Sequence, residues 1–101
     1  MAKHILFEDS SSTGAGTAFD WSGGLGEITI AGTVGTYAGA AQVSPDDGTT
    51  WLTMKDVNGN DISFTAAGTA IFWQPTGVKI RVNNTTVTSS TITGSLFDDK
   101  V

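Results

Sequence analysis

The sequence predicts an all-β chain that folds as a single antiparallel β-sandwich, jelly-roll or immunoglobulin-like, with about eight short strands. Runs of β-branched, aromatic and aliphatic residues alternate with turn residues at intervals of about 8 to 12 positions. No segment keeps the period of a helix, and the 13 glycines are spread along the chain. Only 15% of the residues are charged, whereas Thr, Ser and Asn are abundant. The strands are therefore expected to present a neutral polar surface.

The 101 residues are enough for one domain with a modest core. We expect residues 1–9 to form an N-terminal strand or docking arm, residues 10–97 to form the sandwich, and residues 98–101 to form a charged C-terminal tail. Because the chain has no Cys, its stability is expected to come from packing, hydrogen bonds or assembly rather than from disulfides.

The first element, residues 3–8, carries three apolar residues in succession. Ile5, Leu6 and Phe7 would need cover on both faces of an extended strand. This favours a strand that lies between two neighbours, or an arm that adds a strand to the edge of another subunit. These three residues are therefore the predicted interaction site.

The later elements show alternation of apolar and polar residues. In residues 27–31, Ile28 and Ile30 share one face of the strand, while Glu27 and Thr29 share the other. The expected strands are residues 17–21, 25–34, 37–44, 49–54, 62–65, 69–74, 78–82 and 85–96, with a turn at residues 83–84 and a bulge or break at residues 89–90.

Two features predict where packing is dense. Residues 38–41 are all Ala or Gly, so we expect a facing sheet or subunit to approach closely there. The three tryptophans, Trp21, Trp51 and Trp73, are expected to fill the core, because each indole contributes a large buried area.

The clearest hairpin turn matches the Asp-box pattern Ser-x-Asp-x-Gly-x-Thr-Trp at Ser44, Asp46, Gly48, Thr50 and Trp51. In proteins that carry this pattern the Asp bonds turn amides and the aromatic ring packs beneath, so the resemblance implies a structural turn. The pattern is best known as a repeat in sialidase propellers. A propeller needs several blades of about four strands each, whereas this chain has one box in 101 residues. We therefore expect a self-capping hairpin without catalytic chemistry.

A second structural turn is expected at Asn58 and Gly59, because Asn-Gly favours a type I′ hairpin. The oxygen-bearing residues Asp56, Asn58 and Asn60 also match the first half of an EF-hand loop. The sixth position of that loop is Asp61 rather than the required Gly. A hairpin in which side chains bond the backbone is favoured, and a loose Ca²⁺ site stays open as the alternative.

The sequence offers few groups for catalysis. His4 is the only histidine, so a zinc site would have to be completed by carboxylates alone. Nothing resembles the Gly-x-Ser-x-Gly elbow of serine hydrolases. The adjacent pairs Asp46–Asp47 and Asp98–Asp99 point apart on an extended chain and make poor acid–base pairs. We expect no enzyme activity, no catalytic residue, no metal and no cofactor.

The charge pattern limits the partners. The net charge is −5, and the five Lys and Arg residues are scattered, so a groove that follows phosphates, and hence a nucleic-acid partner, is not expected. No apolar run is long enough to span a membrane, and the N-terminus lacks the apolar core of a signal peptide. We expect synthesis in a cytosol, without export and without a membrane partner.

Residues 41–83 contain three stretches in a characteristic order, Gln-Val-Ser-Pro-Asp-Asp-Gly-Thr-Thr-Trp, then Lys-Asp-Val-Asn-Gly-Asn-Asp-Ile-Ser-Phe-Thr-Ala-Ala-Gly-Thr, then Pro-Thr-Gly-Val-Lys-Ile-Arg-Val. This run resembles the small Cys-free β proteins of tailed-bacteriophage virions. Proteins of that class decorate capsids, cement capsomers, or form parts of tails and fibres. The resemblance covers less than half of the chain and carries no catalytic residues.

The resemblance implies a non-enzymatic structural protein of a virion, made in the host cytoplasm. It favours a capsid decoration or cement protein that binds the major capsid protein or another virion protein as an oligomer, expected to be a homotrimer at local threefold positions. Weak contacts of single copies then act together. The alternative is a carbohydrate- or receptor-binding module of a tail or head fibre, which would require Trp21 or Trp73 to be exposed beside polar groups.

Overall fold

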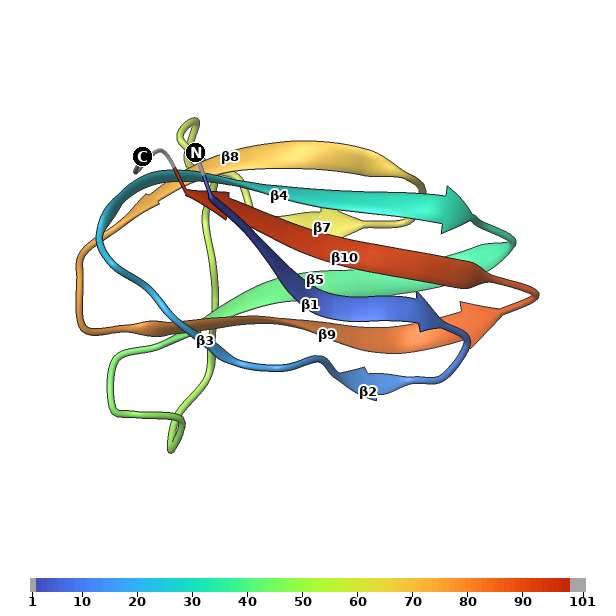
Figure 1. The fold of residues 1–101 in the computed structure, drawn as a ribbon, viewed down its shortest axis with the longest axis horizontal. Coiled ribbons are helices and arrows are strands. Elements are labelled where there is room, and N and C mark those ends of the chain that lie inside the picture. Colours follow the sequence, from blue (N-terminus) through green and yellow to red (C-terminus); the bar gives the residue numbers. More distant parts are fainter. Residues whose placement is uncertain (1, 99–101) are drawn as a thin grey trace.

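The computed structural model describes residues 2–98, which form ten strands in two antiparallel sheets packed on one another (Figure 1). The four-stranded sheet has the order β1-β10-β4-β8. Its strands are β1 (Ala2–Ser10), β10 (Thr91–Asp98), β4 (Gly24–Thr33) and β8 (Gly68–Gln74). Within residues 2–98 there is no helix long and apolar enough to cross a membrane.

The six-stranded sheet is built around the pair β9 (Lys79–Thr88) and β5 (Thr36–Ser44). Two short strands, β2 (Gly14–Ala15) and β3 (Phe19–Asp20), pair with β9. Two others, β6 (Leu52–Thr53) and β7 (Ser63–Phe64), pair with β5.

The order of the strands identifies the topology. If β2 with β3 and β6 with β7 are each counted as one interrupted strand, the sandwich has eight strands, as the sequence predicts. In chain order they lie 1-8-3-6 in one sheet and 2-7-4-5 in the other. This is the strand order of a jelly roll, in which nearly every connection crosses from one sheet to the other. The all-β sandwich is confirmed, and of the two topologies left open by the sequence the jelly roll is observed.

The core lies between the two sheets and draws on both. Alternation places Ile28 and Ile30 of β4 opposite Ile80 and Val82 of β9, all at most 1% exposed. The buried apolar residues are Leu6, Trp21, Ile28, Ile30, Tyr37, Ala41, Val43, Met54, Ile62, Phe64, Phe72, Val78, Ile80, Val82, Ile92 and Leu96.

Trp21 fills the core as expected, and a glycine makes this possible. Its ring lies 5.0 Å from the ring of Phe72, between ring centroids, and its indole N–H donates to the carbonyl of Gln74 at 3.1 Å. A Cβ on Gly26 would lie 2.5 Å from the Trp21 ring and 2.6 Å from the Phe72 ring. The absence of a side chain at Gly26 therefore leaves the space that the two rings occupy.

The turn expected at residues 83–84 is absent, because these residues lie within strand β9. The strand continues through both asparagines to Thr88, because Asn84 is buried and its Oδ1 accepts a 2.6 Å hydrogen bond from the Tyr37 hydroxyl. The chain reverses instead at Ser89, whose φ is +52°, so the break expected at residues 89–90 is the turn between β9 and β10. Local turn preference is overridden here by a hydrogen bond between residues 47 positions apart.

Three predicted strands shrink to short pairings, because none of these stretches finds a long partner in the sheet. Residues 17–21 contribute only β3, residues 49–54 only β6, and residues 62–65 only β7. Asp98, placed in the tail by the sequence, is the last residue of β10 and is buried, opposite Gly26 and Ala2 in register. Met1 and the rest of the expected tail, residues 99–101, lie outside the described residues.

Candidate interaction surface

The outer face of the four-stranded sheet carries the exposed apolar side chains that most need an explanation. Leu25 on β4 lies directly opposite Trp73 on β8, and Glu27 lies opposite Ile71. On the other side of β4, Phe97 of β10 lies opposite Glu27, and Lys3 of β1 lies opposite Phe97. With Ile5, two positions beyond Lys3 on β1, these residues form one surface. We call it the outer patch: Lys3, Ile5, Leu25, Glu27, Ile71, Trp73 and Phe97.

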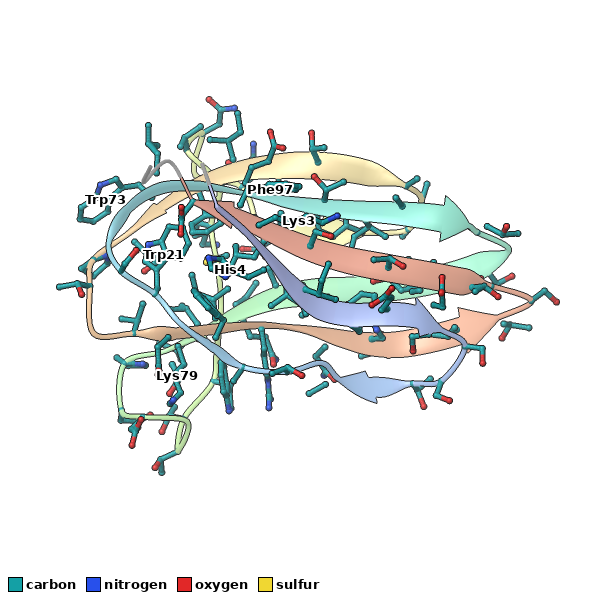
Figure 2. All side chains as sticks on the ribbon, in the orientation of Figure 1. Lys3, His4, Trp21, Trp73, Lys79 and Phe97 are labelled. Carbon is teal, nitrogen blue, oxygen red and sulfur yellow. The ribbon has the colours of Figure 1, made fainter. Side chains whose placement is uncertain are left out.

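The outer patch is accessible. Trp73 is 58% exposed, and Ile71, Leu25 and Ile5 are 48%, 46% and 42% exposed. In Figure 2 the Trp73 ring projects away from the sandwich, whereas Trp21 lies within it. The expectation that Trp73 fills the core is therefore wrong. Its neighbour Phe72 points inward and is fully buried, and successive residues of a strand face opposite sides of the sheet.

Backbone geometry brings the apolar pairs of the patch close together. The N–H of Val57 donates to the carbonyl of Ile71 at 3.0 Å, so that carbonyl points away from β4. The pair Ile71–Glu27, and with it the pair Trp73–Leu25, is then a non-hydrogen-bonded pair, in which side chains of antiparallel strands approach most closely. Leu25, Ile71 and Trp73 thus make one continuous apolar surface at the β8 edge.

The outer face of the six-stranded sheet is different in kind. Its large ring, Trp51, is half-buried and lies outside the core, so the expectation that Trp51 fills the core is also wrong. The guanidinium group of Arg81 covers the ring, 4.0 Å from its centroid. The Arg81 side chain also donates to Gln42 Oε1 at 2.8 Å. Lys79 contacts the carboxylates of Asp20 and Asp47 at 2.6 and 3.5 Å, and the hydrogen bond to Asp20 raises the pKa of Lys79. The polar groups of this face satisfy one another.

The turn that follows β5 is held by two side chains. Asp46 Oδ1 accepts hydrogen bonds from the Ser44 hydroxyl at 2.8 Å and from the Thr50 N–H at 2.7 Å. Ser44 Oγ in turn accepts from the Gly48 N–H at 2.8 Å. Bonds from Thr50 and Ser44 lower the pKa of Asp46. A Cβ on Gly48 would lie 3.9 Å from the Trp51 ring, so the five residues of the box meet in one structural turn.

The turn at residues 56–60 is not the type I′ turn that the sequence predicts, because that type requires positive φ at both Asn58 and Gly59. Only Gly59 has it, at +84°. Asp56 shifts the turn because its backbone carbonyl accepts from the Gly59 N–H at 3.0 Å, and its Oδ1 accepts from the amides of Asn58 and Asn60 at 2.8 and 3.0 Å. This is a three-residue loop with a bulge at Gly59.

Asp61 pairs with Lys55 beside this turn. The carboxylates that would have to bind Ca²⁺ are thus engaged with the chain itself. Within residues 2–98 no group of three or more metal-ligating His, Asp or Glu side chains is found.

His4 also takes part in a structural contact. Its Nε2 lies 3.0 Å from Asp98 Oδ2, and its ring stacks on Phe19 with 3.9 Å between ring centroids. The contact ties the ends of β1 and β10 to β3. A depression of about 310 Å³ lies near Asp56 and Asp61, between that turn and β8, and His4 does not line it.

The predicted docking residues Ile5, Leu6 and Phe7 divide between two faces. β1 pairs with β10 of the same chain, with a register shift between Ile5 and Phe7. Leu6 is buried in the chain's own core at 2% exposed. The Phe7 ring lies over Gly94, where a Cβ would come within 2.5 Å of it. Ile5 alone of the three belongs to the outer patch, whereas Phe7 is half-buried against the core.

The outer patch has no clear signal in the sequence. The run Ile71-Phe72-Trp73 is apolar without a break, so it was assigned no outward face. In an extended strand, Thr69, Ile71 and Trp73 lie on one face and Ala70 and Phe72 on the other. The pairing of β8 with β4 is needed to show which face is outward. The pairing of Lys3, Phe97 and Glu27 joins the two ends of the chain and has no local signal.

Comparison with solved structures shows a likeness in fold. The crystal structure of the SPBc2 prophage-derived protein YomS has a TM-score of 0.73 to this chain at 11% sequence identity, and the match covers 95% of this chain and 90% of that one. At this identity the likeness shows a shared fold. No protein-family model and no curated protein sequence matches the chain.

Proposed function

We propose that this chain is a non-enzymatic structural protein of a bacteriophage virion, most simply a capsid decoration or cement protein that binds the shell through several copies. The observation that carries the proposal is the outer patch, which puts an exposed Trp, Leu and Ile side by side on one face of a sheet. Monomeric soluble proteins rarely leave such residues contiguous and uncovered. The whole-chain fold likeness to a prophage-derived protein supports a bacteriophage source.

The non-enzymatic part of the proposal is supported by what the ionisable groups do. The carboxylates of Asp46 and Asp56 hold turn amides, His4 is paired with Asp98 and stacked on Phe19, and Lys79 bridges two carboxylates. Groups that fix turns and strand ends in this way are held away from one another rather than converging on one cleft.

The experiment is quantitative mass spectrometry of virions purified from a culture that expresses the chain from its natural genome. The proposal expects the chain in the particles at a fixed ratio to the major shell protein, with a copy number comparable to that of the shell. A fixed but much lower copy number would move the protein from the capsid to a tail or fibre. Absence from the particles overturns the proposal.

The second candidate is a carbohydrate- or receptor-binding module, and the exposure of Trp73 favours it. Sugar sites combine an aromatic platform with polar groups that bond the hydroxyls, whereas the nearest outward neighbours of Trp73 are Leu25 and Ile71. Titration with a panel of glycans, followed by Trp fluorescence, separates the two. Saturable quenching that is lost in Trp73→Ser would establish the second candidate and displace the first.

A further inference from the structure

The geometry points to a self-complementary contact in which the outer patch packs face to face on the outer patch of a second copy, about a twofold axis that runs along β10. The inference rests on the part of the proposed function in which the chain assembles with copies of itself. It names the surface, the symmetry and the residues that meet.

The apolar residues supply the first step. Phe97 lies on β10, at the centre of the patch, with Ile5 on β1 to one side and Leu25 and Ile71 to the other. Faces of two β-sheets pack about 10 Å apart with their side chains interdigitated. A second sheet laid on this face about an axis along β10 would cover Phe97, Ile5 and Leu25 together, whereas Ile71 and Trp73 on β8 would lie beyond the partner's edge strand β1.

The charges supply the second step. Glu27 is the carboxylate of the patch; its strand partners are Phe97 and Ile71, and its Oε1 accepts a 3.4 Å hydrogen bond from the Thr29 hydroxyl. A partner that covers this charge is favoured if it brings a cation. Within residues 2–98 the other cations have partners in the chain: Lys55 with Asp61, Lys79 with Asp20 and Asp47, and Arg81 with Gln42 and Trp51. Lys3 is exposed, and among the described residues it makes no ion pair.

The positions of Lys3 and Glu27 are related by symmetry, which favours a second copy of this chain as the partner of the outer patch. Lys3 and Glu27 both lie opposite Phe97, on the strands that flank β10 on its two sides. Figure 2 shows Lys3 and Phe97 near each other on this part of the sheet. Rotation by half a turn about an axis along β10 exchanges the two flanking strands. It therefore brings Lys3 of one copy to Glu27 of the other, and Glu27 to Lys3, with Phe97 on Phe97.

A contact of this kind is isologous, because the same surface serves both copies. It produces pairs, whereas the resemblance to virion proteins implies trimers. Among the described residues the patch holds one cation, Lys3, and one anion, Glu27, so the half-turn brings these two opposite charges together and pairs no like charges of residues 2–98 within the patch. Complementary charges across an interface set its register more than its strength.

The test uses charge reversal in the full-length chain. Lys3→Glu leaves two carboxylates in each patch, and Glu27→Lys leaves two ammonium groups. Each variant alone should associate at least about tenfold more weakly than the wild-type chain, because like charges then face each other across the axis. An equimolar mixture of the two should form mixed pairs at wild-type strength, and the double variant K3E/E27K should pair with itself again.

The readout is native mass spectrometry with one variant isotopically labelled, supported by sedimentation velocity over a range of concentrations. Lys55→Glu, on an exposed residue outside the patch, is the matched control and should pair like the wild type. Circular dichroism confirms that each variant is folded. The mixture matters because a contact between Lys3 and Glu27 within one chain would be lost in both single variants without being restored by mixing them.

Recovery of mixed pairs supports the inference. A wild-type chain that stays monomeric or forms trimers, single variants that pair as well as wild type, or a mixture that forms no mixed pairs would each overturn it. The proposed function is judged separately by the virion measurement. Presence in particles without this pairing defeats the inference alone, and pairing without presence in particles defeats the proposed function alone.

Discussion

The outer faces of the two sheets differ in whether their tryptophan side chains are covered. On the six-stranded sheet Trp51 is covered by Arg81, and Arg81 is bonded to Gln42. On the four-stranded sheet Trp73 and Leu25 lie side by side, at 58% and 46% exposed, and no side chain of residues 2–98 stacks on Trp73 as Arg81 stacks on Trp51. The tryptophan of one face is therefore covered by a side chain of the same sheet. The other face leaves its tryptophan exposed beside aliphatic residues, a composition typical of surfaces that bind another protein.

The same contrast exists between neighbouring residues of β8, where the largest effect is expected. Phe72→Ala should lower the free energy of unfolding by about 3–5 kcal/mol, because a fully buried ring is removed from the core. Trp73→Ser should change it by no more than about 0.5 kcal/mol, because that ring makes its contacts on the open face. Urea denaturation of both variants checks this, and similar losses would contradict the assignment of Trp73 to an open surface.

Inside the six-stranded sheet, Gly39→Ala should cost about 1–3 kcal/mol of stability through overpacking. The added Cβ would lie 2.1 Å from the Tyr37 hydroxyl and 2.8 Å from Asn84 Oδ1, in the sheet's buried polar pair. Gly68→Ala is the matched control, since a Cβ there meets nothing within 4 Å. Thermal unfolding compares the two, and equal melting temperatures would show that the space around Tyr37 is not tight.

Alkaline pH gives a further test of that buried pair. Burial raises the pKa of Tyr37 to about 12, whereas an unfolded tyrosine titrates near 10. The stability that depends on the neutral phenol is therefore complete below about pH 10 and is lost as the pH rises toward 12, by an amount on the order of 2 kcal/mol. Denaturation at pH 9 and pH 11.5 measures this loss, and Tyr37→Phe should remove most of the dependence. An unchanged dependence in the variant would assign it to other groups.

The smallest effect is expected at the turn between β5 and β6. Hydrogen bonds from Thr50 and Ser44 lower the pKa of Asp46, so its contribution to stability is present above the ordinary Asp pKa of about 4 and is lost as the pH falls through the lowered value. Asp46→Asn should reduce the loss of melting temperature between pH 5 and pH 2.5. A variant as acid-sensitive as the wild-type chain would show that the charge of Asp46 does not hold the turn.

The fold could be predicted where its signals are local. Alternation placed Ile28 and Ile30 on the inner face of β4, and turn chemistry placed the reversals near Asp46 and Gly59. The prediction failed at Asn84, because the strand there is held by the distant Tyr37 hydroxyl rather than by neighbours in sequence. The short pairings of β3 and β6 likewise depend on partners that the sequence does not specify.

The candidate surface could not be predicted for the same reason. The run Ile71-Phe72-Trp73 predicts an apolar strand, but pairing with β4 determines which of its side chains face the core. The juxtaposition of Lys3, Phe97 and Glu27 arises from pairing across three strands from the beginning, the end and the first third of the chain. Register is fixed by the whole sandwich and carries no signal in any one segment.

Hydroxyl-radical footprinting, compared between the free chain and the chain bound in the virion, tests most directly whether the four-stranded sheet is the face that binds protein. Trp73 and Leu25 report on the outer patch, while Trp51 and Leu52, which is 52% exposed, report on the six-stranded sheet. We predict that Trp73 and Leu25 lose most of their reactivity on assembly and that Trp51 and Leu52 keep theirs. Protection of Trp51 and Leu52, with Trp73 still reactive, would contradict the account.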